Sequence, residues 1–260
     1  MDSALDIKAS ISGQPWRWRR QGGDTLTEDL TDQLLLARGI PLEDLARHRS
    51  PTIRDFLPDP SVFRDMDVAA SRLADALDRQ ESIAIFGDYD VDGATSAALL
   101  ILLLRRLGAD PIAYIPDRLM EGYGPSGSAL VGLRDRGVDL VVTVDCGAQA
   151  FDALAQAKAA GLDVIVCDHH QCATSLPEAV AMINPNRLDE GEEGAAHGHV
   201  AAVGMAFLLG VALLRELRKR GRFVGGNVEP RIIDLLVTSG VRLDTWRLPA
   251  EREQSLDAIQ

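Results

Sequence analysis

The sequence contains no apolar run long enough to cross a membrane. The longest one, residues 97–104, ends at Arg105 and falls far short of the roughly 20 residues that span a bilayer. Residues 1–16 mix Asp, Lys, Ser and Gly without an apolar stretch, so we expect no signal peptide. The pattern therefore predicts neither a membrane span nor a secretory leader.

Cysteine is scarce as well. Cys146, Cys167 and Cys172 form an odd set whose spacings fit neither a disulfide framework nor a zinc knuckle. This composition favours a reducing cytoplasm as the location. We expect Cys146 and Cys167 to pack as small buried hydrophobic residues rather than to bind metal.

Positive charge is not in excess. The chain has 27 Lys and Arg against 39 Asp and Glu, a formal net charge of −12, which argues mildly against a stand-alone nucleic-acid binder. Bound cations would neutralise part of that charge if clustered aspartates are metal ligands. Local basic patches therefore matter more than the total.

The hydrophobic content and the order of the elements indicate the fold class. A chain of 260 residues with 46% hydrophobic residues can form one large α/β domain plus a smaller appendage. Short β-branched runs alternate with helical stretches, which predicts a doubly wound, mostly parallel sheet. The expected strands are residues 82–87, 111–115, 139–145, 163–167 and 180–183, and the expected helices 67–79, 94–107, 126–136, 149–160 and 200–220.

Three parts are expected along the chain. Residues 1–60 lack strand signals and carry a helical stretch at 27–38, so we expect a small helical N-terminal extension over residues 1–66. The core α/β domain covers residues 67–225. A divergent C-terminal segment, 226–260, follows a glycine-rich connector.

Three acidic clusters each follow a predicted strand. They read Gly-Asp-Tyr-Asp-Val-Asp-Gly at 87–93, Val-Asp-Cys-Gly at 144–147 and Asp-His-His at 168–170. One Asp-Gly turn, or one Asp-His-His at a helix start, is more often structural than functional. Because parallel strands meet with their carboxyl ends at one edge of the sheet, three such clusters together predict one divalent-metal site.

Oxygen ligands beside an imidazole suit Mn²⁺ or Mg²⁺ better than zinc. Two ions about 3.5–4 Å apart, bridged by one carboxylate, activate a water molecule and stabilise an in-line displacement at phosphorus. We therefore predict two metal ions and hydrolysis of a phosphoester.

The order of these clusters resembles the DHH phosphoesterase superfamily, and within it the RecJ-type exonucleases, which degrade single-stranded DNA from 5′ to 3′ in DNA repair and recombination. Further segments carry the same resemblance, at residues 35–40, 56–58, 114–118, 121–124, 184–186 and 203–207. The similarity extends from about residue 34 to residue 236.

The resemblance implies roles for particular residues. The implied metal ligands are Asp90, Asp92, Asp145 and His169, with Asp145 as the bridging carboxylate. Asp88, Asp168 and His170 are implied to lie in or directly behind the ligand shell, with His170 part of the catalytic set. Some members place a histidine where this chain has Phe86, so we expect a weaker first metal site in which Asp88 compensates.

The resemblance fails near the C-terminus. RecJ-type proteins continue into a fourth motif whose aspartate completes the metal site, whereas this chain offers only Asp244 as a weak substitute. The family's substrate-binding DHHA1 domain and oligonucleotide-binding domain are not recognised in the sequence. We therefore expect a truncated chain that is weakly active or inactive by itself.

Arg118 and Tyr123 are the best candidates for contacting single-stranded DNA, because phosphates need cations and bases stack on aromatic rings. The Lys and Arg residues at 215–222 suit either DNA contact or a solvated helix end where cations complement the helix dipole, and we favour the second. The Trp and Arg residues at 16–20 suit either DNA contact or a docked tail. A single-strand-binding protein or a helicase is a further partner implied by the resemblance.

Two other functions fit the same sequence. One is a DHH hydrolase of small phosphoesters such as short oligonucleotides or cyclic dinucleotides. The other is a non-catalytic fragment that binds metal, DNA or a protein partner.

Overall fold

The computed structural model describes residues 9–14, 29–225 and 228–238. These described residues fall into two compact units, the second of which begins at Pro58. The N-terminal unit is helical, as predicted, and Asp29 caps its first helix by accepting hydrogen bonds from the backbone N–H groups of Thr31 and Asp32. Its elements are α1 (Leu30–Ala37), η1 (Leu42–Asp44), α2 (Leu45–Arg49) and α3 (Ile53–Phe56).

The second unit is built on a parallel sheet whose strands have the order β2-β1-β3-β4-β5 in the described part of the chain. The strands are β1 (Ile83–Gly87), β2 (Ile112–Tyr114), β3 (Leu140–Val144), β4 (Asp163–Cys167) and β5 (Ala181–Ile183). Gly87 pairs with Val144, and Val144 pairs with Cys167, so β1, β3 and β4 end level with one another. The residues that follow these three strands therefore lie at one edge of the sheet.

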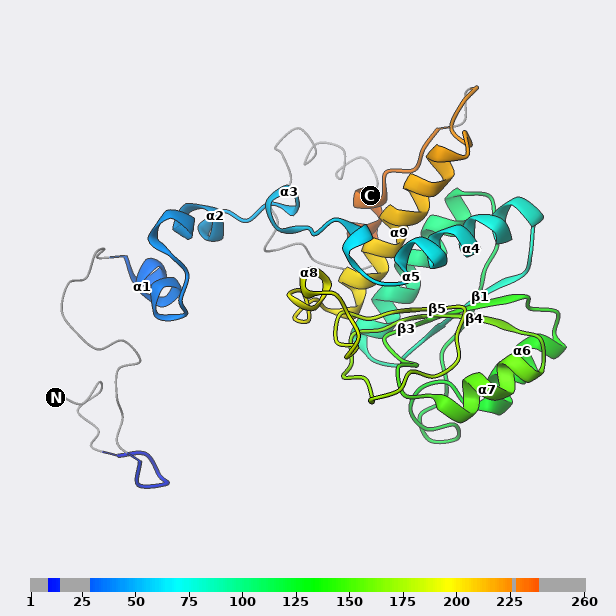
Figure 1. The fold of residues 1–260 in the computed structure, drawn as a ribbon, viewed down its shortest axis with the longest axis horizontal. Helices are drawn as coiled ribbons and strands as arrows, with labels where there is room; N and C mark the ends of the chain where they lie inside the picture. Colours follow the sequence, from blue (N-terminus) through cyan, green and yellow to red (C-terminus); the bar gives the residue numbers. More distant parts are fainter. Residues whose placement is uncertain (1–8, 15–28, 226–227, 239–260) are drawn as a thin grey trace. The chain divides into compact units, whose positions relative to one another are not determined.

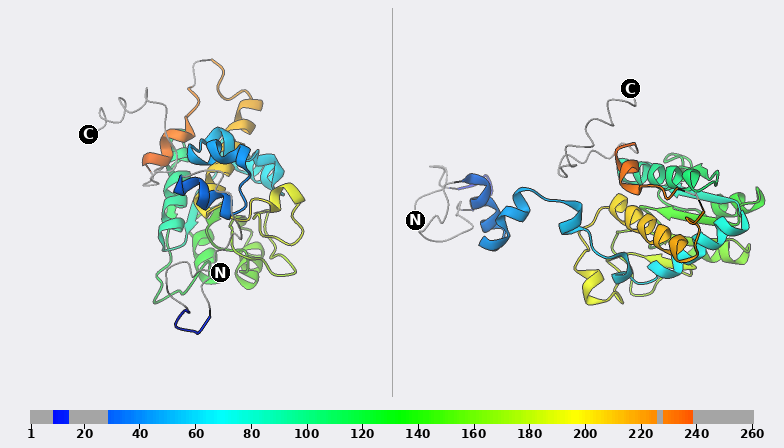
Figure 2. Two further views of the ribbon diagram at one scale, coloured as in Figure 1. Left: turned by 90° about the vertical axis from the view of Figure 1, so that its left-hand side faces the viewer. Right: turned by 90° about the horizontal axis from the view of Figure 1, so that it is seen from above.

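Helices cover both faces of the sheet (Figure 1; two further views in Figure 2). One face carries α4 (Met66–Arg79), α5 (Val91–Arg106) and α9 (Ala202–Lys219), and the other carries α6 (Gly127–Asp135) and α7 (Phe151–Ala159). The short elements of this unit are η2 (Pro60–Val62), α8 (Glu192–Ala195) and α10 (Ile232–Thr238). This confirms the predicted doubly wound α/β fold.

Burial on both faces explains why the strands could be recognised. All five residues of β1 and all five of β3 are buried, which is why these strands read as continuous apolar runs rather than as alternating patterns. The chain reverses its direction of winding between β1 and β3. In doubly wound sheets, the crevice at the carboxyl ends of two such strands is where ligands bind.

The structure differs from the prediction in a few places. The sheet unit begins at Pro58, whereas the core domain was predicted to begin at residue 67. Helix α10 lies in the segment predicted to diverge, and the short helices α2, α3 and α8 lacked a recognisable pattern. Residues 226–227 and 239–260, including Asp244, lie outside the described residues, so the three-part division stays a prediction. Within the described ranges, no helix combines the length and apolarity that a membrane span requires.

Candidate metal centre

The first acidic cluster forms the turn between β1 and α5. Asp88 follows β1 directly and is 3% exposed, while Asp90 is the N-cap of α5 and accepts a hydrogen bond of 2.9 Å from the Gly93 N–H. A Cβ atom on Gly93 would lie 2.5 Å from the carbonyl oxygen of Asp88. Only glycine therefore lets the first turn of α5 fold back onto Asp88, and this gathers the carboxylates of the motif.

Asp145 follows β3 and has a backbone conformation that residues other than glycine rarely adopt. Its φ is 61°, in the left-handed region, and the residue is 2% exposed. Such strain costs on the order of 1–3 kcal/mol and is concentrated at functional sites. Burial, together with the charges of Asp92 and Asp90, raises the pKa of Asp145 to about 8. The fold thus places a carboxylate where its negative charge is poorly stabilised by the protein alone.

The ring of His169, which follows β4, lies against Asp145. Its Nε2 is 3.2 Å from Oδ1 of Asp145, and its Nδ1 is 3.1 Å from the carbonyl oxygen of Val200. Because a carbonyl oxygen only accepts, the proton of a neutral His169 ring belongs on Nδ1. This leaves the lone pair of Nε2 directed at the acidic cluster, the arrangement that metal-binding histidines use.

Asp168 organises the turn that carries both histidines. Its Oδ1 accepts from the N–H groups of His169 and His170 and lies 2.7 Å from Nδ1 of His170, while its Oδ2 accepts from the Ala148 N–H. Burial favours the neutral acid, but the bonds from His170 and from the backbone outweigh it and lower the pKa of Asp168. The bond to Asp168 in turn raises the pKa of His170 to about 8.

Two groups of side chains in the described part of the chain could each hold a metal ion. One consists of Asp145, His169 and His170, and the other of Asp88, Asp90 and Asp145. Within each group the ligand atoms lie within 4.8 Å of one another. Asp145 belongs to both groups, and carboxylates with imidazole are a donor set that fits Mn²⁺ or Mg²⁺.

Asp92 has other partners. Its two oxygens accept hydrogen bonds of 2.9 Å from the N–H groups of Ala202 and Val203, the first residues of α9. The same carboxylate is 4.0 Å from Nε2 of His169. The structure therefore gives Asp92, like Asp168, a positioning contact at the edge of the site, and the ligand roles implied for these two aspartates stay predictions.

Two tyrosines and an arginine lie beside the site. The Tyr123 hydroxyl is 3.3 Å from the backbone oxygen of Asp145 and 3.5 Å from the His170 ring nitrogens, and Tyr123 is 57% exposed. The Arg118 guanidinium lies 5.0 Å from the centre of the Tyr89 ring, which itself meets Tyr123 edge to face. Both predicted substrate residues are thus next to the acidic cluster. Tyr89 was missed, although an aromatic residue between two aspartates was a usable signal.

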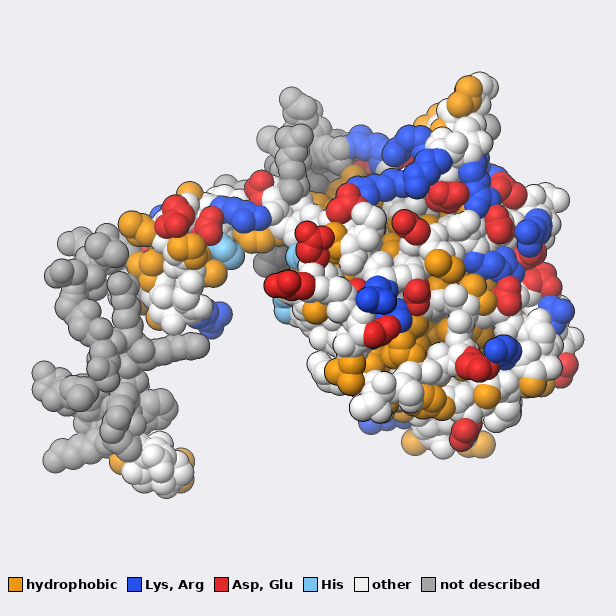
Figure 3. Space-filling model, viewed as in Figure 1, with side chains coloured by type: hydrophobic (Ala, Val, Ile, Leu, Met, Phe, Trp, Pro, Cys, Tyr) orange, Lys and Arg blue, Asp and Glu red, His pale blue; other side chains and the backbone are white. Residues whose placement is uncertain are grey.

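The basic end of α9 is not a free cationic patch. Figure 3 shows Lys and Arg side chains there beside acidic ones. Arg215 pairs with Asp59, and Arg220 pairs with Asp75 and Asp78 of neighbouring elements. These two guanidiniums are held by carboxylates rather than left to solvent. The tryptophans and arginines at 16–20 lie outside the described residues.

Two asparagines that follow β5 belong to the site, although the sequence marked them only as part of a resemblance. Asn184 and Asn186 donate hydrogen bonds to the backbone oxygens of His170 and His169. Their position after a strand of the same sheet was the available signal. The Val200 carbonyl carried no signal, because every residue has one. Cys146 and Cys167 are fully buried, as expected.

Comparison with known proteins bears on the same residues. The model of the DHH family, N-terminal domain, matches residues 82–239, which include all three acidic clusters. The chain is 38% identical over 213 residues to the single-stranded-DNA-specific exonuclease RecJ of Bacillus subtilis (strain 168), covering 77% of this chain and 26% of that protein. It is 39% identical over 210 residues to the RecJ of Escherichia coli (strain K12), covering 80% and 35%. The chain thus spans about a third or less of these relatives.

Solved structures give the same result. The crystal structure of an exonuclease RecJ bound to manganese is similar with a TM-score of 0.56 and 33% identity, over 69% of this chain and 43% of that one. RecJ of Thermus thermophilus in complex with Mn²⁺ is similar with a TM-score of 0.57 and 28% identity, over 79% and 27%. The predicted resemblance is confirmed, and the chain belongs to the DHH family.

Proposed function

We propose that this chain is the DHH part of a single-stranded-DNA-specific exonuclease that hydrolyses phosphodiester bonds with two divalent metal ions. The observation that carries the proposal is the place of Asp145, whose carboxylate belongs to two potential ligand groups at the ends of adjacent strands. The similarity to RecJ proteins, which are single-stranded-DNA-specific exonucleases, supports single-stranded DNA as the substrate. The 5′-to-3′ direction rests on the resemblance.

In this proposal Asp145, His169 and His170 hold one ion, and Asp88, Asp90 and Asp145 hold the other. Asp92 and Asp168 complete the shell from behind, and Asp90, Asp92, Asp145, His169 and His170 form the catalytic set. Mn²⁺ or Mg²⁺ held by these residues would supply a nucleophilic water at neutral pH and would neutralise charge on the phosphate. Manganese in related RecJ crystals supports this choice of metal.

The tyrosines and the arginine beside the acidic cluster have the chemistry to hold a single strand of DNA. Tyr123 and Tyr89 offer aromatic faces for bases, and Arg118, next to them, offers a cation for a phosphate. Stacking requires unpaired bases, so this arrangement favours single strands over duplex. A cytoplasmic location, and a single-strand-binding protein or helicase as partner, complete the proposal by resemblance.

The test is the release of nucleotides from 5′-labelled single-stranded DNA by the 260-residue chain with Mn²⁺. We expect faster release from long single strands than from duplex DNA or dinucleotides, and none from the Asp145→Ala variant. The rate is expected to be low, because the matched part covers only 26% and 35% of the two relatives.

Each alternative has its own result in this assay. Faster cleavage of dinucleotides would assign the chain to the hydrolases of small phosphoesters. Equal rates for wild type and Asp145→Ala would contradict the site. Mn²⁺ binding without any hydrolysis would mean that the reaction needs parts that this chain does not contain.

A further inference from the structure

Two asparagine amides hold the backbone of the histidine pair. Nδ2 of Asn184 lies 2.9 Å from the His170 oxygen, and Nδ2 of Asn186 lies 2.6 Å from the His169 oxygen. Asn184 is fully buried, and its Oδ1 accepts a hydrogen bond of 2.8 Å from the Asn186 N–H. The first asparagine therefore fixes the second, and the second reaches His169.

Asn186 also holds the loop that contacts the other end of His169. Its Nδ2 lies 3.0 Å from the backbone oxygen of Gly198, in the loop that leads to Val200. The Val200 oxygen accepts the Nδ1 proton of His169. One amide thus anchors both the backbone of His169 and the segment that carries the acceptor for its ring. Both protons of the amide are used, since each partner is a carbonyl oxygen.

The same loop is held from its far side by Asp92, through the N–H groups of Ala202 and Val203. The Val200 carbonyl therefore lies between two anchors, the Asn186 amide and the Asp92 carboxylate. The loop also has turn bonds of its own, such as that from the Val200 N–H to the His197 oxygen. Without the Asn186 amide it loses its link to the His169 backbone, so the acceptor can shift relative to the His169 ring. A neutral imidazole without a fixed partner divides its proton between both nitrogens.

We propose that Asn186 is a positioning residue that fixes the Nδ1–H tautomer of His169 and so directs Nε2 at Asp145. This role concerns the metal-free protein. Its consequence for Mn²⁺ affinity rests on the proposed function. Groups that orient metal-binding histidines typically change metal affinity by roughly 10- to 100-fold when they are removed.

The first readout is the tautomer of His169 in the metal-free, ¹⁵N-histidine-labelled chain, observed by NMR at pH 7.5, where the raised pKa of Asp145 keeps most of its carboxyl protonated and so able to donate to Nε2. We expect the Nδ1–H tautomer in the wild type and a mixture of tautomers in Asn186→Ala, which removes both bonds without burying a charge. The second readout is Mn²⁺ affinity by calorimetry, which we expect to fall by roughly 10-fold or more.

Gly198→Ala disturbs the hydrogen bond between Asn186 and Gly198 from the Gly198 side. Its Cβ would lie 2.4 Å from Oδ1 of Asn186, so the amide must move. The matched control is Gln149→Ala, which removes an exposed side-chain amide bond of 2.8 Å to the Gln171 oxygen. We expect this control to keep both the His169 tautomer and the Mn²⁺ affinity. Thermal unfolding of each variant verifies that it is folded.

The outcomes separate the two proposals. An unchanged tautomer in folded Asn186→Ala and Gly198→Ala would overturn the role of Asn186. A wild-type chain that shows the fixed tautomer, loses it in Asn186→Ala and binds no Mn²⁺ would support that role and overturn the proposed metal-dependent function.

Discussion

The two ends of strand β3 carry an aspartate each, and their surroundings are opposite. Asp139, before the strand, accepts hydrogen bonds from the Ser82 N–H and from Arg134, and these lower its pKa. Asp145, after the strand, is buried beside further carboxylates, and its pKa rises to about 8. One end is neutralised by the protein itself. At the other end the protein disfavours the charged form of the carboxylate, which an external cation can stabilise.

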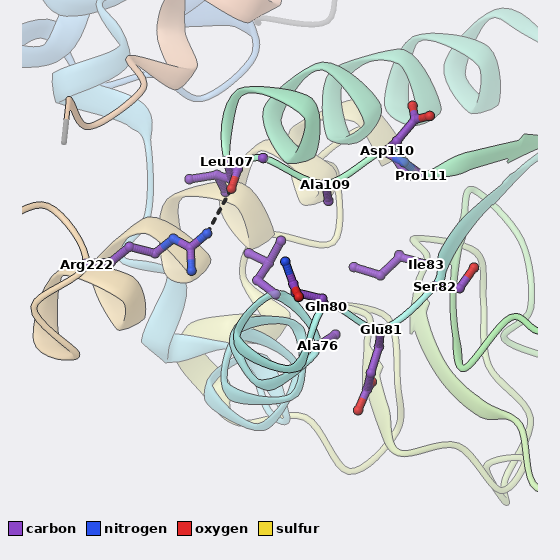
Figure 4. A pocket seen from close by; sticks show the side chains of 12 residues that line it. Ala76, Gln80, Glu81, Ser82, Ile83, Leu107, Ala109, Asp110, Pro111 and Arg222 are labelled. Carbon is purple, nitrogen blue, oxygen red and sulfur yellow. Dashed lines mark hydrogen bonds between the residues drawn. The ribbon is translucent and has the colours of Figure 1, made fainter.

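Other acids at the amino edge are paired as Asp139 is. At the amino edge, Arg72 lies 2.7 Å from both Glu81 and Asp163, so those acids are paired. A cavity of about 310 Å³ at this edge, where Arg222 donates to the Leu107 oxygen, is lined by the ends of α4 and α5 (Figure 4). The predicted site residues all lie at or near the carboxyl edge. The amino edge thus holds a cavity whose neighbouring acids are paired with arginine, whereas Asp145 at the carboxyl edge lies beside further carboxylates.

The largest expected effect is the response of the carboxyl edge to Mn²⁺. At about 100 times its Kd, a ligand of the folded state adds about 2.7 kcal/mol of stability per site. Asp145→Asn is expected to lose this gain, because the carboxylate belongs to both ligand groups. Without metal, the variant should be at least as stable as the wild type, since the charged form of Asp145 is already disfavoured. Thermal unfolding with and without Mn²⁺ measures both effects, and an undiminished Mn²⁺ response in the variant would refute the site.

Breaking the pairing at the amino edge should have the opposite signature. Arg72→Ala leaves Glu81 and Asp163 without their shared cation, and we expect a loss of about 2 kcal/mol, because Arg72 and Glu81 are largely buried. The stabilisation by Mn²⁺ should be unchanged. Urea unfolding measures the loss. A variant as stable as the wild type would show that the amino edge is not held by these pairs.

Asp139→Asn is the closest counterpart of the change at Asp145, because both residues flank β3. It weakens bonds from Ser82 and Arg134, and we expect a loss of about 0.5–1 kcal/mol, reduced by solvent screening of a partly exposed pair. Mn²⁺ affinity should not change. If this variant altered Mn²⁺ binding as Asp145→Asn does, the distinction between the two ends of β3 would be lost.

The smallest effect concerns acid. The pKa of Asp139 is lowered in the folded state. Its contribution to the stability of the fold is therefore complete above the ordinary aspartate pKa of about 3.9, and it is lost as the pH falls through the pKa of the folded state. Urea unfolding between pH 5 and pH 2 should therefore show a shallower loss of stability for Asp139→Asn than for the wild type. Parallel curves would mean that the bonds from Ser82 and Arg134 contribute nothing.

Much of the fold followed from the sequence because the sheet is buried on both faces. Runs such as residues 140–144 are unbroken series of β-branched and apolar residues, and the acidic turns directly after them could be assigned to one edge. The convergence of Asp90, Asp145 and His169 was therefore predictable from topology. Their individual roles as ligands came from the resemblance rather than from spacing.

The rest depends on contacts between distant parts of the chain. Asp92 binds Ala202 across 110 positions, and His169 binds the Val200 carbonyl across 31. No local pattern marks a backbone carbonyl as an acceptor for a particular ring. Asn186 is an example. The sequence shows an asparagine there, but its two hydrogen-bond partners are backbone oxygens, which no sequence pattern identifies.

The most direct test of the carboxyl edge is the number of Mn²⁺ ions that the 260-residue chain binds at equilibrium. We predict two ions per chain for the wild type and the loss of both in Asp145→Ala, because each ligand group contains that carboxylate. A wild-type chain that binds no Mn²⁺, or an Asp145→Ala variant that still binds two ions with the same affinity, would contradict the two-metal site.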